Sequence, residues 1–235
     1  MGDTRHVIAL GGGGFSMEDN PALDLYVLEQ SSADNPEICF VPTASGDSDT
    51  YIAEFYAAFA KHDCRPSHLR FFRRTPVDLR SFVLSKDIIY VGGGNTKSML
   101  AVWREWGLDV ILREAWESGI VLAGISAGSI CWFEQGVTDS VAVSLTSLPC
   151  LGLIPGSNCP HYDGEKDRRP FYHQLMLDGE IQPGLALDDG AAAHFEGTEL
   201  KAVVSSREHA RAYRVSMTGD EAAEDVITPS FLGGP

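Results

Sequence analysis

A serine between two glycines, at the end of an apolar run, is the residue of this sequence best placed to act as a nucleophile. The segment Gly124-Ile125-Ser126-Ala127-Gly128 fits the pattern Gly-x-Ser-x-Gly. In that pattern small neighbours permit a sharp turn from strand to helix, which exposes the serine Oγ and aims the next N–H group at a developing oxyanion. The same pattern also occurs at tight strand–helix junctions without chemistry, so the surrounding residues must decide between the two interpretations.

A serine nucleophile needs a base, and the chain has seven histidines. His161 is favoured as the base for two reasons. Pro160 holds the residue before it, Cys159, extended, and the surrounding loop is long and polar, which is typical of functional segments. His194 is the second candidate. Surface or capping roles are assigned to the other five: His6, His62, His68, His173 and His209.

An acid must then orient the base. Asp188 and Asp189 stand before Gly190 where a probable strand ends in a turn, and Asp139 lies in another turn. Aspartate in turns most often satisfies backbone N–H groups, so the residue types alone leave the acid open.

A second glycine-rich loop, residues 92–94, also follows an apolar run. At the carboxyl edge of a parallel sheet its N–H groups would face a ligand, so Gly94 is placed to give a second oxyanion donor, and Asn95 is a candidate substrate-binding residue. The spacing fits neither the dinucleotide-binding fingerprint nor the phosphate-binding loop. The run 11–14 is assigned a structural role, since no partner residue is evident.

Two adjacent arginines, Arg168 and Arg169, follow His161 by a few residues in this acidic chain. Such a pair is normally solvated. On a functional loop their planar guanidinium groups would instead bind a substrate carboxylate.

The elements that would hold these residues follow from the apolar periodicity. In the first 135 residues apolar runs alternate with helical patterns, which predicts an α/β fold with a mostly parallel sheet and helices on both faces. The expected strands are 6–10, 37–45, 68–72, 85–94 and 120–126, and the expected helices are 21–32, 50–62, 97–119 and 127–134. The later part predicts a strand at 141–148, a long loop at 150–170, a helix at 171–179 and a β-meander over 184–217.

Composition sets further bounds. The 235 residues show no linker, which predicts one domain over 1–235. A net charge of −15 argues against nucleic acid and anionic membranes as partners. Five widely spaced cysteines suggest reduced thiols in the cytoplasm rather than disulfides or a metal site. Neither a membrane-spanning apolar run nor the long apolar stretch of a signal peptide is found.

Four segments together resemble the motifs of the peptidase E family, which includes the α-aspartyl dipeptidases and the cyanophycinases. They are VGGGNT (91–96), GISAGS (124–129), CPHYDG (159–164) and ALDDGAA (186–192), in the order and spacing of the family. The resemblance extends from the first strand to about residue 196. It implies a three-layer fold similar to class I glutamine amidotransferases, here with a strand-rich C-terminal part.

The resemblance also implies roles for individual residues. Ser126 matches the nucleophile of the family, His161 its base and Asp189 its acid, while the N–H groups of Gly94 and Ala127 would form the oxyanion hole. The best-known members carry Glu where this chain has Asp189. Asp139 matches an aspartate that has also been considered for the acid, and stays the alternative.

The implied activity is that of a serine peptidase that hydrolyses short peptides, dipeptides with N-terminal Asp above all, through an acyl-enzyme and without cofactor or metal. Arg168 is the first candidate for binding the aspartyl side chain and Arg169 the second. The sequence is compatible with a homodimer.

Other functions remain open from the sequence. One is an esterase or amidase on the same triad, and another is a non-catalytic module that binds a small anion through its glycine loops.

A glutaminase is disfavoured because that chemistry uses cysteine at the position of Ser126. An α/β-hydrolase would place the acid before the histidine. It would take the acid from Asp139, Asp163 or Asp178 and the base from His194 or His209.

Overall fold

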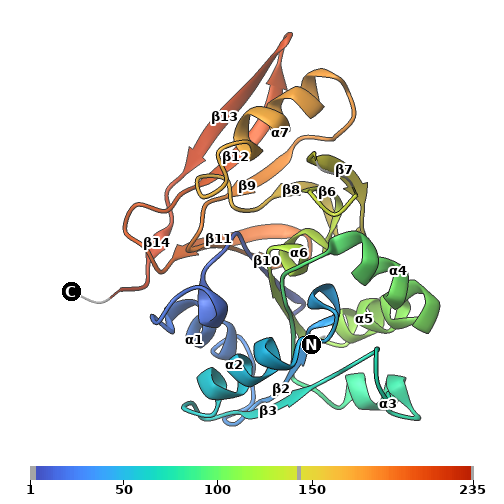
Figure 1. Ribbon diagram of the computed structural model, residues 1–235. Helices are drawn as coiled ribbons and strands as arrows, with labels where there is room; N and C mark the ends of the chain where they lie inside the picture. Colours follow the sequence, from blue (N-terminus) through green and yellow to red (C-terminus); the bar gives the residue numbers. More distant parts are fainter. Residues whose placement is uncertain (1–3, 142–143, 234–235) are drawn as a thin grey trace.

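The computed structural model describes residues 4–141 and 144–233, which form two β-sheets and the helices that pack on them (Figure 1). The strands of the larger sheet are β1 (His6–Leu10), β2 (Glu37–Val41), β3 (Arg65–His68), β4 (Ile88–Val91), β5 (Val121–Ile125), β10 (Ala191–Glu196), β11 (Glu199–Ser205) and β14 (Ser230–Phe231). Those of the second sheet are β6 (Phe133–Thr138), β7 (Thr146–Pro149), β8 (Ile154–Cys159), β9 (Gly184–Leu187), β12 (Ala212–Thr218) and β13 (Glu221–Ile227).

Seven α-helices and two short 3₁₀ segments are found in the described ranges. The helices are α1 (Ala22–Leu28), α2 (Asp49–Phe59), α3 (Leu79–Leu84), α4 (Thr96–Trp106), α5 (Leu108–Glu117), α6 (Ala127–Ile130) and α7 (Arg168–Leu177). The 3₁₀ segments are η1 (Gly14–Ser16) and η2 (Thr43–Ser45). None of the described helices is long and apolar enough to cross a membrane.

The larger sheet has the strand order β14-β11-β10-β1-β5-β4-β2-β3. Five neighbouring strands, β1, β5, β4, β2 and the edge strand β3, are parallel, so their carboxyl ends meet at one edge. Ligands of open α/β sheets bind at that edge. The α/β fold with helices on both faces of a mostly parallel sheet is confirmed, and it is consistent with the fold of class I glutamine amidotransferases.

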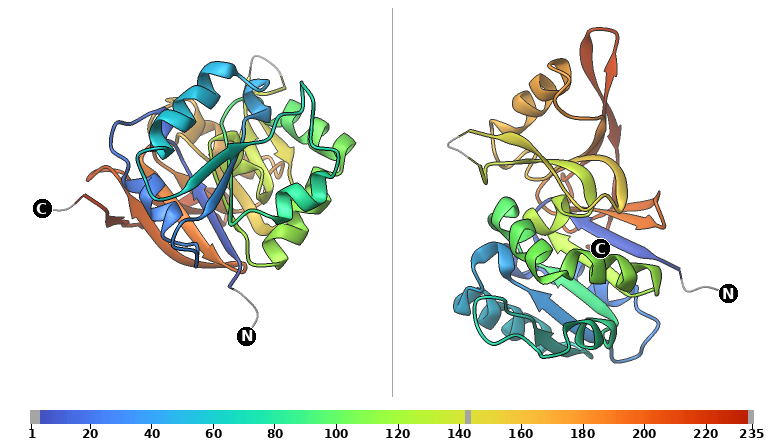
Figure 2. Two further views of the ribbon diagram at one scale, coloured as in Figure 1. Left: turned by 90° about the horizontal axis from the view of Figure 1, so that it is seen from below. Right: turned by 90° about the vertical axis from the view of Figure 1, so that its right-hand side faces the viewer.

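Alternation along the strands creates the two packed faces of this sheet. On β1, Ile8 and Leu10 pack with α1 and α2, while Val7 and Ala9 face the cluster that contains residues of α3, α4 and α5. The view from below in Figure 2 shows the blue and cyan helices and the green helices on opposite sides of the strands. The strands that the sequence predicts from continuous apolar runs are therefore the ones buried on both faces of the sheet.

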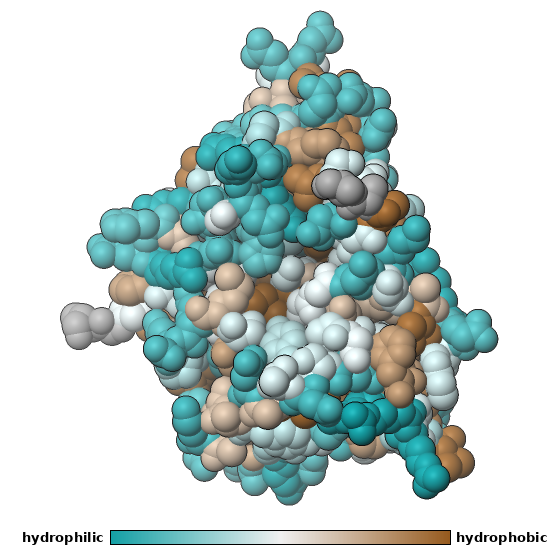
Figure 3. Space-filling view, in the orientation of Figure 1, coloured by the Kyte–Doolittle hydropathy of each residue, from teal (hydrophilic) through white to brown (hydrophobic). Residues whose placement is uncertain are grey.

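The second sheet, in the order β13-β12-β9-β8-β6-β7, is the main departure from the expected fold. Together with α7 it forms the upper part of the molecule in Figure 1. In Figure 3, hydrophilic side chains dominate the upper and lower parts, and paler residues of intermediate hydropathy gather between them. The meander expected over 184–217 is wrong, because β9 and β12 lie in this sheet while β10 and β11 lie in the larger one.

The loop expected at 150–170 is also wrong, since it contains β8. The polar residues that suggested a loop are buried and paired there. Ser157 Oγ is hydrogen-bonded to Tyr172 Oη at 2.6 Å, and Asn158 Oδ1 accepts from Ser129 Oγ at 3.0 Å. Polar side chains thus occupy a buried strand because distant residues satisfy them.

Other boundaries differ in smaller ways. The third strand is Arg65–His68 rather than 68–72, because Asp47 accepts the N–H groups of Phe71 and Phe72 and the chain leaves the sheet. The helix expected at 127–134 stops at Ile130, and β6 begins at Phe133. Of the strand expected at 141–148, residues 142 and 143 lie outside the described residues and β7 covers the end.

A buried histidine on β10 predicts a pH-dependent stability. His194 is 3% exposed, with Nε2 2.8 Å from His6 Nδ1 and Nδ1 2.7 Å from Tyr26 Oη. Burial, and then the charge of His6, lower the pKa of His194 to about 4. The unfolded chain binds this proton from about pH 6.5, so stability present above that pH is lost as the pH falls towards 4.

We expect wild type to lose about 2 kcal/mol more unfolding free energy between pH 7 and pH 4.5 than His194→Asn does. Urea denaturation at both pH values measures the difference. His209→Asn removes an exposed histidine and should follow wild type. Equal losses in wild type and His194→Asn would contradict the assignment.

Candidate active site

Ser126 lies in the turn between β5 and α6, with φ 56° and ψ −112°. Such positive φ values are uncommon for residues other than glycine and cluster at functional sites. A Cβ on Gly124 would lie 2.4 Å from the carbonyl oxygen of Gly128, and one on Gly128 would lie 2.3 Å from that of Val91. Both glycines are therefore required for the strand and the helix to approach this closely.

Of the candidate acids, the structure brings Asp189 to His161. His161 Nδ1 lies 2.6 Å from Asp189 Oδ1, and the two side chains are 12% and 13% exposed. Asp139 is exposed in the turn after β6. No hydrogen bond joins His161 to Ser126 among the described residues, and bonds of this kind often form only when substrate is bound.

The end of β1 holds the backbone of Ser126, of His161 and of Gly190 in the acid loop. Three consecutive carbonyl oxygens, beginning with that of its last residue, Leu10, accept hydrogen bonds from three segments that are far apart in the sequence. The pairs are Leu10 O with Ser126 N–H (3.2 Å), Gly11 O with His161 N–H (3.0 Å) and Gly12 O with Gly190 N–H (3.0 Å). One strand end thus sets the spacing of the serine, the histidine and the acid loop.

The sequence predicts only a structural role for the glycine run after β1, and this prediction misses its contact with the candidate site. A Cβ on Gly12 would lie 2.0 Å from Asp189 Oδ1 and 3.0 Å from His161 Nδ1. On the other side of the carboxylate, a Cβ on Gly164 would lie 2.4 Å from Asp189 Oδ2. The feature of the sequence that indicates this role is the position of the glycine run at the carboxyl end of a central parallel strand.

Two neighbouring aspartates explain why Asp189, rather than Asp188, faces the histidine. Asp163 Oδ1 accepts the Asp189 N–H at 2.8 Å and so links the histidine loop to the acid loop. Asp188 is buried, and its Oδ2 accepts the Arg211 N–H at 2.9 Å. Burial, and then the charge of Asp163, raise the pKa of Asp188 to about 6.

Of the two expected oxyanion donors, Ala127 follows Ser126 directly and Gly94 belongs to the glycine loop that contacts the serine turn. A Cβ on Gly93 would be 3.3 Å from Ser126 Cβ and 3.7 Å from Ser126 Oγ, so the glycine loop touches the turn. Gly94 has φ 134°, and a Cβ there would lie 2.3 Å from the carbonyl oxygen of Ala44. Within the part of the chain that the structure describes, neither the Gly94 N–H nor the Ala127 N–H donates a hydrogen bond.

Asn95 and Arg168 are engaged within the protein. Asn95 caps α4, with Oδ1 accepting the Ser98 N–H at 2.8 Å. The Arg168 side chain is 4% exposed, and all three of its guanidinium nitrogens donate, Nη1 to the carbonyl oxygen of Val137 at 3.0 Å and the others to Glu165. Arg168 therefore joins α7 to β6 rather than facing solvent.

Arg169 is more accessible. Its guanidinium pairs with Glu224 and lies over the rings of Tyr162 and Tyr213, 5.3 Å and 5.0 Å from their centroids. Although burial opposes ionisation, the hydrogen bonds from Arg169, Tyr162 and His173 lower the pKa of Glu224. A substrate carboxylate at Arg169 would compete with this ionised side chain.

The residues of the α/β-hydrolase alternative are not brought together at Ser126. Both ring nitrogens of His194 are occupied by His6 and Tyr26. His209 is exposed, and Asp178 accepts a hydrogen bond from Gln174.

Comparisons with known proteins identify the family of the chain. The chain matches peptidase family S51 over residues 7–203. It is 60% identical over 230 residues to "Uncharacterized peptidase YgaJ" of Bacillus subtilis (strain 168), covering 97% of this chain and 100% of that protein. It is 29% identical over 190 residues to "Peptidase E" of Streptomyces coelicolor, covering 75% of this chain and 74% of the relative.

Among solved structures, a peptidase from an acI-B1 Actinobacterium superposes with a TM-score of 0.73 at 18% identity, covering 97% of this chain and 96% of the other. At that identity the similarity concerns the fold. The resemblance to the peptidase E family is confirmed by the family match and the curated relatives. The chain belongs to peptidase family S51 and is a serine-type peptidase.

Proposed function

We propose that this peptidase cleaves short peptides with a Ser126–His161–Asp189 triad. The observation that carries the proposal is the 2.6 Å contact between His161 and Asp189, together with the anchoring of the serine, the histidine and the acid loop to one strand end. In a serine triad the acid holds the imidazole in the tautomer that leaves Nε2 free to accept a proton.

The reaction follows from these groups. Ser126 Oγ attacks the scissile carbonyl carbon while His161 Nε2 takes the hydroxyl proton and Asp189 stabilises the imidazolium. The Gly94 and Ala127 N–H groups donate to the tetrahedral oxyanion. His161 then protonates the leaving amine, and a water molecule, deprotonated by His161, hydrolyses the acyl-enzyme and restores the serine.

A fluorophosphonate probe tests the nucleophile without knowledge of the substrate. Mass spectrometry of the protein after incubation should show one phosphonyl group on the peptide that contains Ser126. Ester, amide and dipeptide panels then separate a peptidase from an esterase or amidase on the same triad. A folded wild type that takes no label would favour the non-catalytic anion-binding module and refute the triad.

We further propose dipeptides with N-terminal Asp as substrates, with Arg169 as the cation for the aspartyl side chain. Arg169 replaces Arg168 as first candidate because its side chain is 48% exposed, whereas that of Arg168 is 4% exposed. Arg169→Gln should lower the ratio of kcat/KM for Asp-X over Asn-X by about 10- to 100-fold, the effect of losing a hydrogen bond between charged groups.

The matched variant is Arg168→Gln. We expect it to lower the unfolding free energy while leaving the Asp-X over Asn-X ratio near that of wild type, because Arg168 is buried against Val137 and Glu165. An unchanged ratio in Arg169→Gln would remove Arg169 from the binding of the aspartyl side chain.

A further inference from the structure

Residues 92–96 of the glycine loop carry five consecutive N–H groups. Of these five, within the part of the chain that the structure describes, only the Gly94 N–H has no acceptor. The four bonds are Gly92 N–H to Val41 O (3.2 Å), Gly93 N–H to Tyr51 Oη (3.2 Å), Asn95 N–H to Ala44 O (2.8 Å) and Thr96 N–H to Ser140 Oγ (2.8 Å). The peptide groups before and after the Gly93–Gly94 peptide are therefore held by hydrogen bonds. The Gly94 N–H, which belongs to the peptide between them, is left for a ligand.

The acceptor for Gly93 is a side chain, the hydroxyl of Tyr51 on α2. The Tyr51 ring packs against Phe15 and Phe40, with centroids 5.5 Å and 5.0 Å away, and a Cβ on Gly92 would lie 2.9 Å from its Cε1. Burial raises the pKa of this hydroxyl, which keeps it neutral at pH 7. Tyr51 thus offers a fixed, uncharged acceptor to the loop.

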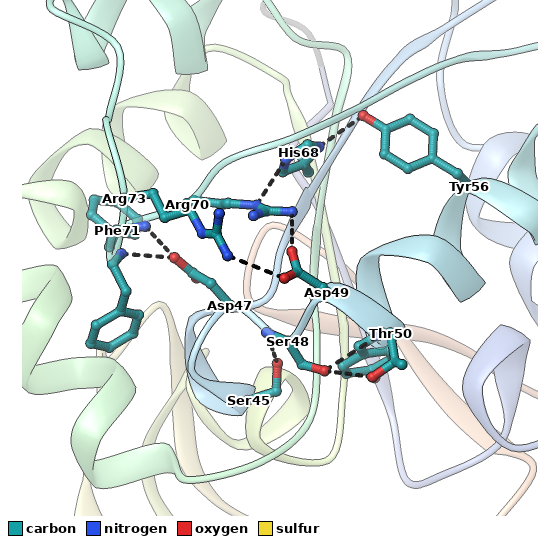
Figure 4. A network of polar contacts seen from close by, with 12 residues as sticks. Ser45, Asp47, Ser48, Asp49, Thr50, Tyr56, His68, Arg70, Phe71 and Arg73 are labelled. Atoms are coloured by element: carbon teal, nitrogen blue, oxygen red, sulfur yellow. Dashed lines mark hydrogen bonds and ion pairs between the residues drawn. The ribbon is translucent and has the colours of Figure 1, made fainter.

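The beginning of α2 is itself anchored to the loop that follows β3, as Figure 4 shows. Ser48 caps the helix by accepting the Tyr51 N–H at 3.4 Å, and Asp47 accepts two N–H groups of the loop after β3. Asp49 pairs with Arg70 at 2.8 Å. These contacts determine where the Tyr51 hydroxyl lies relative to the sheet.

We propose that Tyr51 is a positioning residue for the oxyanion site. Its hydroxyl holds the Gly93 N–H and thereby orients the next peptide, so that the Gly94 N–H faces the oxyanion that forms at Ser126. The inference rests on the proposed function, since it needs Ser126 as nucleophile. Loss of this orientation should weaken binding of the transition state more than binding of substrate.

Tyr51→Phe removes only the hydroxyl. We expect the rate of fluorophosphonate labelling and kcat on a cleaved dipeptide to fall about tenfold, less than the 10²–10³ that follows loss of a donor itself, with KM within about twofold of wild type. Tyr56→Phe is the matched control, because Tyr56 lies on the same helix and its hydroxyl contacts His68 Nδ1 at 2.9 Å. Its labelling rate should equal that of wild type.

The outcomes are distinguishable. If wild type reacts and Tyr51→Phe reacts as fast, the role of Tyr51 is refuted and the triad stands. Equal losses in Tyr51→Phe and Tyr56→Phe would mean a general loosening of α2 and would also refute it. If wild type takes no label, the proposed function fails and the role of Tyr51 fails with it.

Amide hydrogen exchange in wild type provides a second measurement that does not depend on folding of the variant. Gly93 should be protected, while Gly94 should exchange freely until a phosphonyl group is attached to Ser126. Equally fast exchange at Gly93 and Gly94 in the free protein would overturn the proposal.

Discussion

Ser126→Ala is expected to lower kcat on a cleaved dipeptide by ~10⁴–10⁶-fold, as loss of the nucleophile does in serine peptidases with a triad. The fold should be preserved, because the Ser126 N–H bond to Leu10 O does not involve the side chain. Measured kcat and KM, with thermal unfolding of both proteins, provide the comparison. Ser118→Ala removes an exposed hydroxyl at the end of α5 and should leave kcat unchanged.

The double variant Ser126→Ala/His161→Ala makes this prediction sharper. Residues that act as one unit show strongly non-additive losses. The double variant should therefore be about as slow as Ser126→Ala alone. If the two losses multiplied, His161 would act in a different step, and the pairing of His161 with Ser126 would be refuted.

The second large effect is expected at a residue without a side chain. Gly12→Ala places a methyl group 2.0 Å from the present position of Asp189 Oδ1. Because that distance is too short, the carboxylate must move away from His161. Because Gly12 does not have a positive φ, alanine adds no backbone strain there. We expect kcat to fall on the order of 10²–10⁴, approaching the loss seen when the acid of a triad no longer orients its histidine.

Gly219→Ala is the control for a general effect of replacing glycine. Gly219 has φ 63° with no neighbouring atom within 4 Å of its Cβ position, in the turn between β12 and β13. Alanine there should cost about 1–2 kcal/mol of stability through its backbone conformation, with kcat unchanged. Full activity in Gly12→Ala would show that the acid tolerates displacement, or that Asp189 is not the acid.

Local patterns were sufficient for the central part of the fold. Apolar runs separated by helical patterns predicted the parallel strands β1, β2, β4 and β5, although the expected ranges 37–45 and 85–94 extend beyond β2 and β4. The reason is physical: a strand buried on both faces must be apolar at every position, and a chain that turns sharply at its end needs glycine. The same patterns placed Ser126 and Gly94 at one edge of the sheet.

Long-range pairing decided the rest. Nothing local in Pro155, Ser157 or Asn158 predicts a strand, and β8 exists because Tyr172, Ser129 and strands β6 and β9 satisfy its polar groups. The choice among the candidate acids likewise depends on residues that are distant in the sequence.

The sequence by itself therefore determined the chemical types, the parallel sheet and the edge at which the candidate nucleophile lies. Only the tertiary structure decided between Asp189 and Asp139 as the partner of His161, and showed that Gly12 leaves room for the pair and that Arg168 is buried against Glu165. Periodicity reports which face of one element is buried, whereas these contacts depend on how close separate segments approach one another.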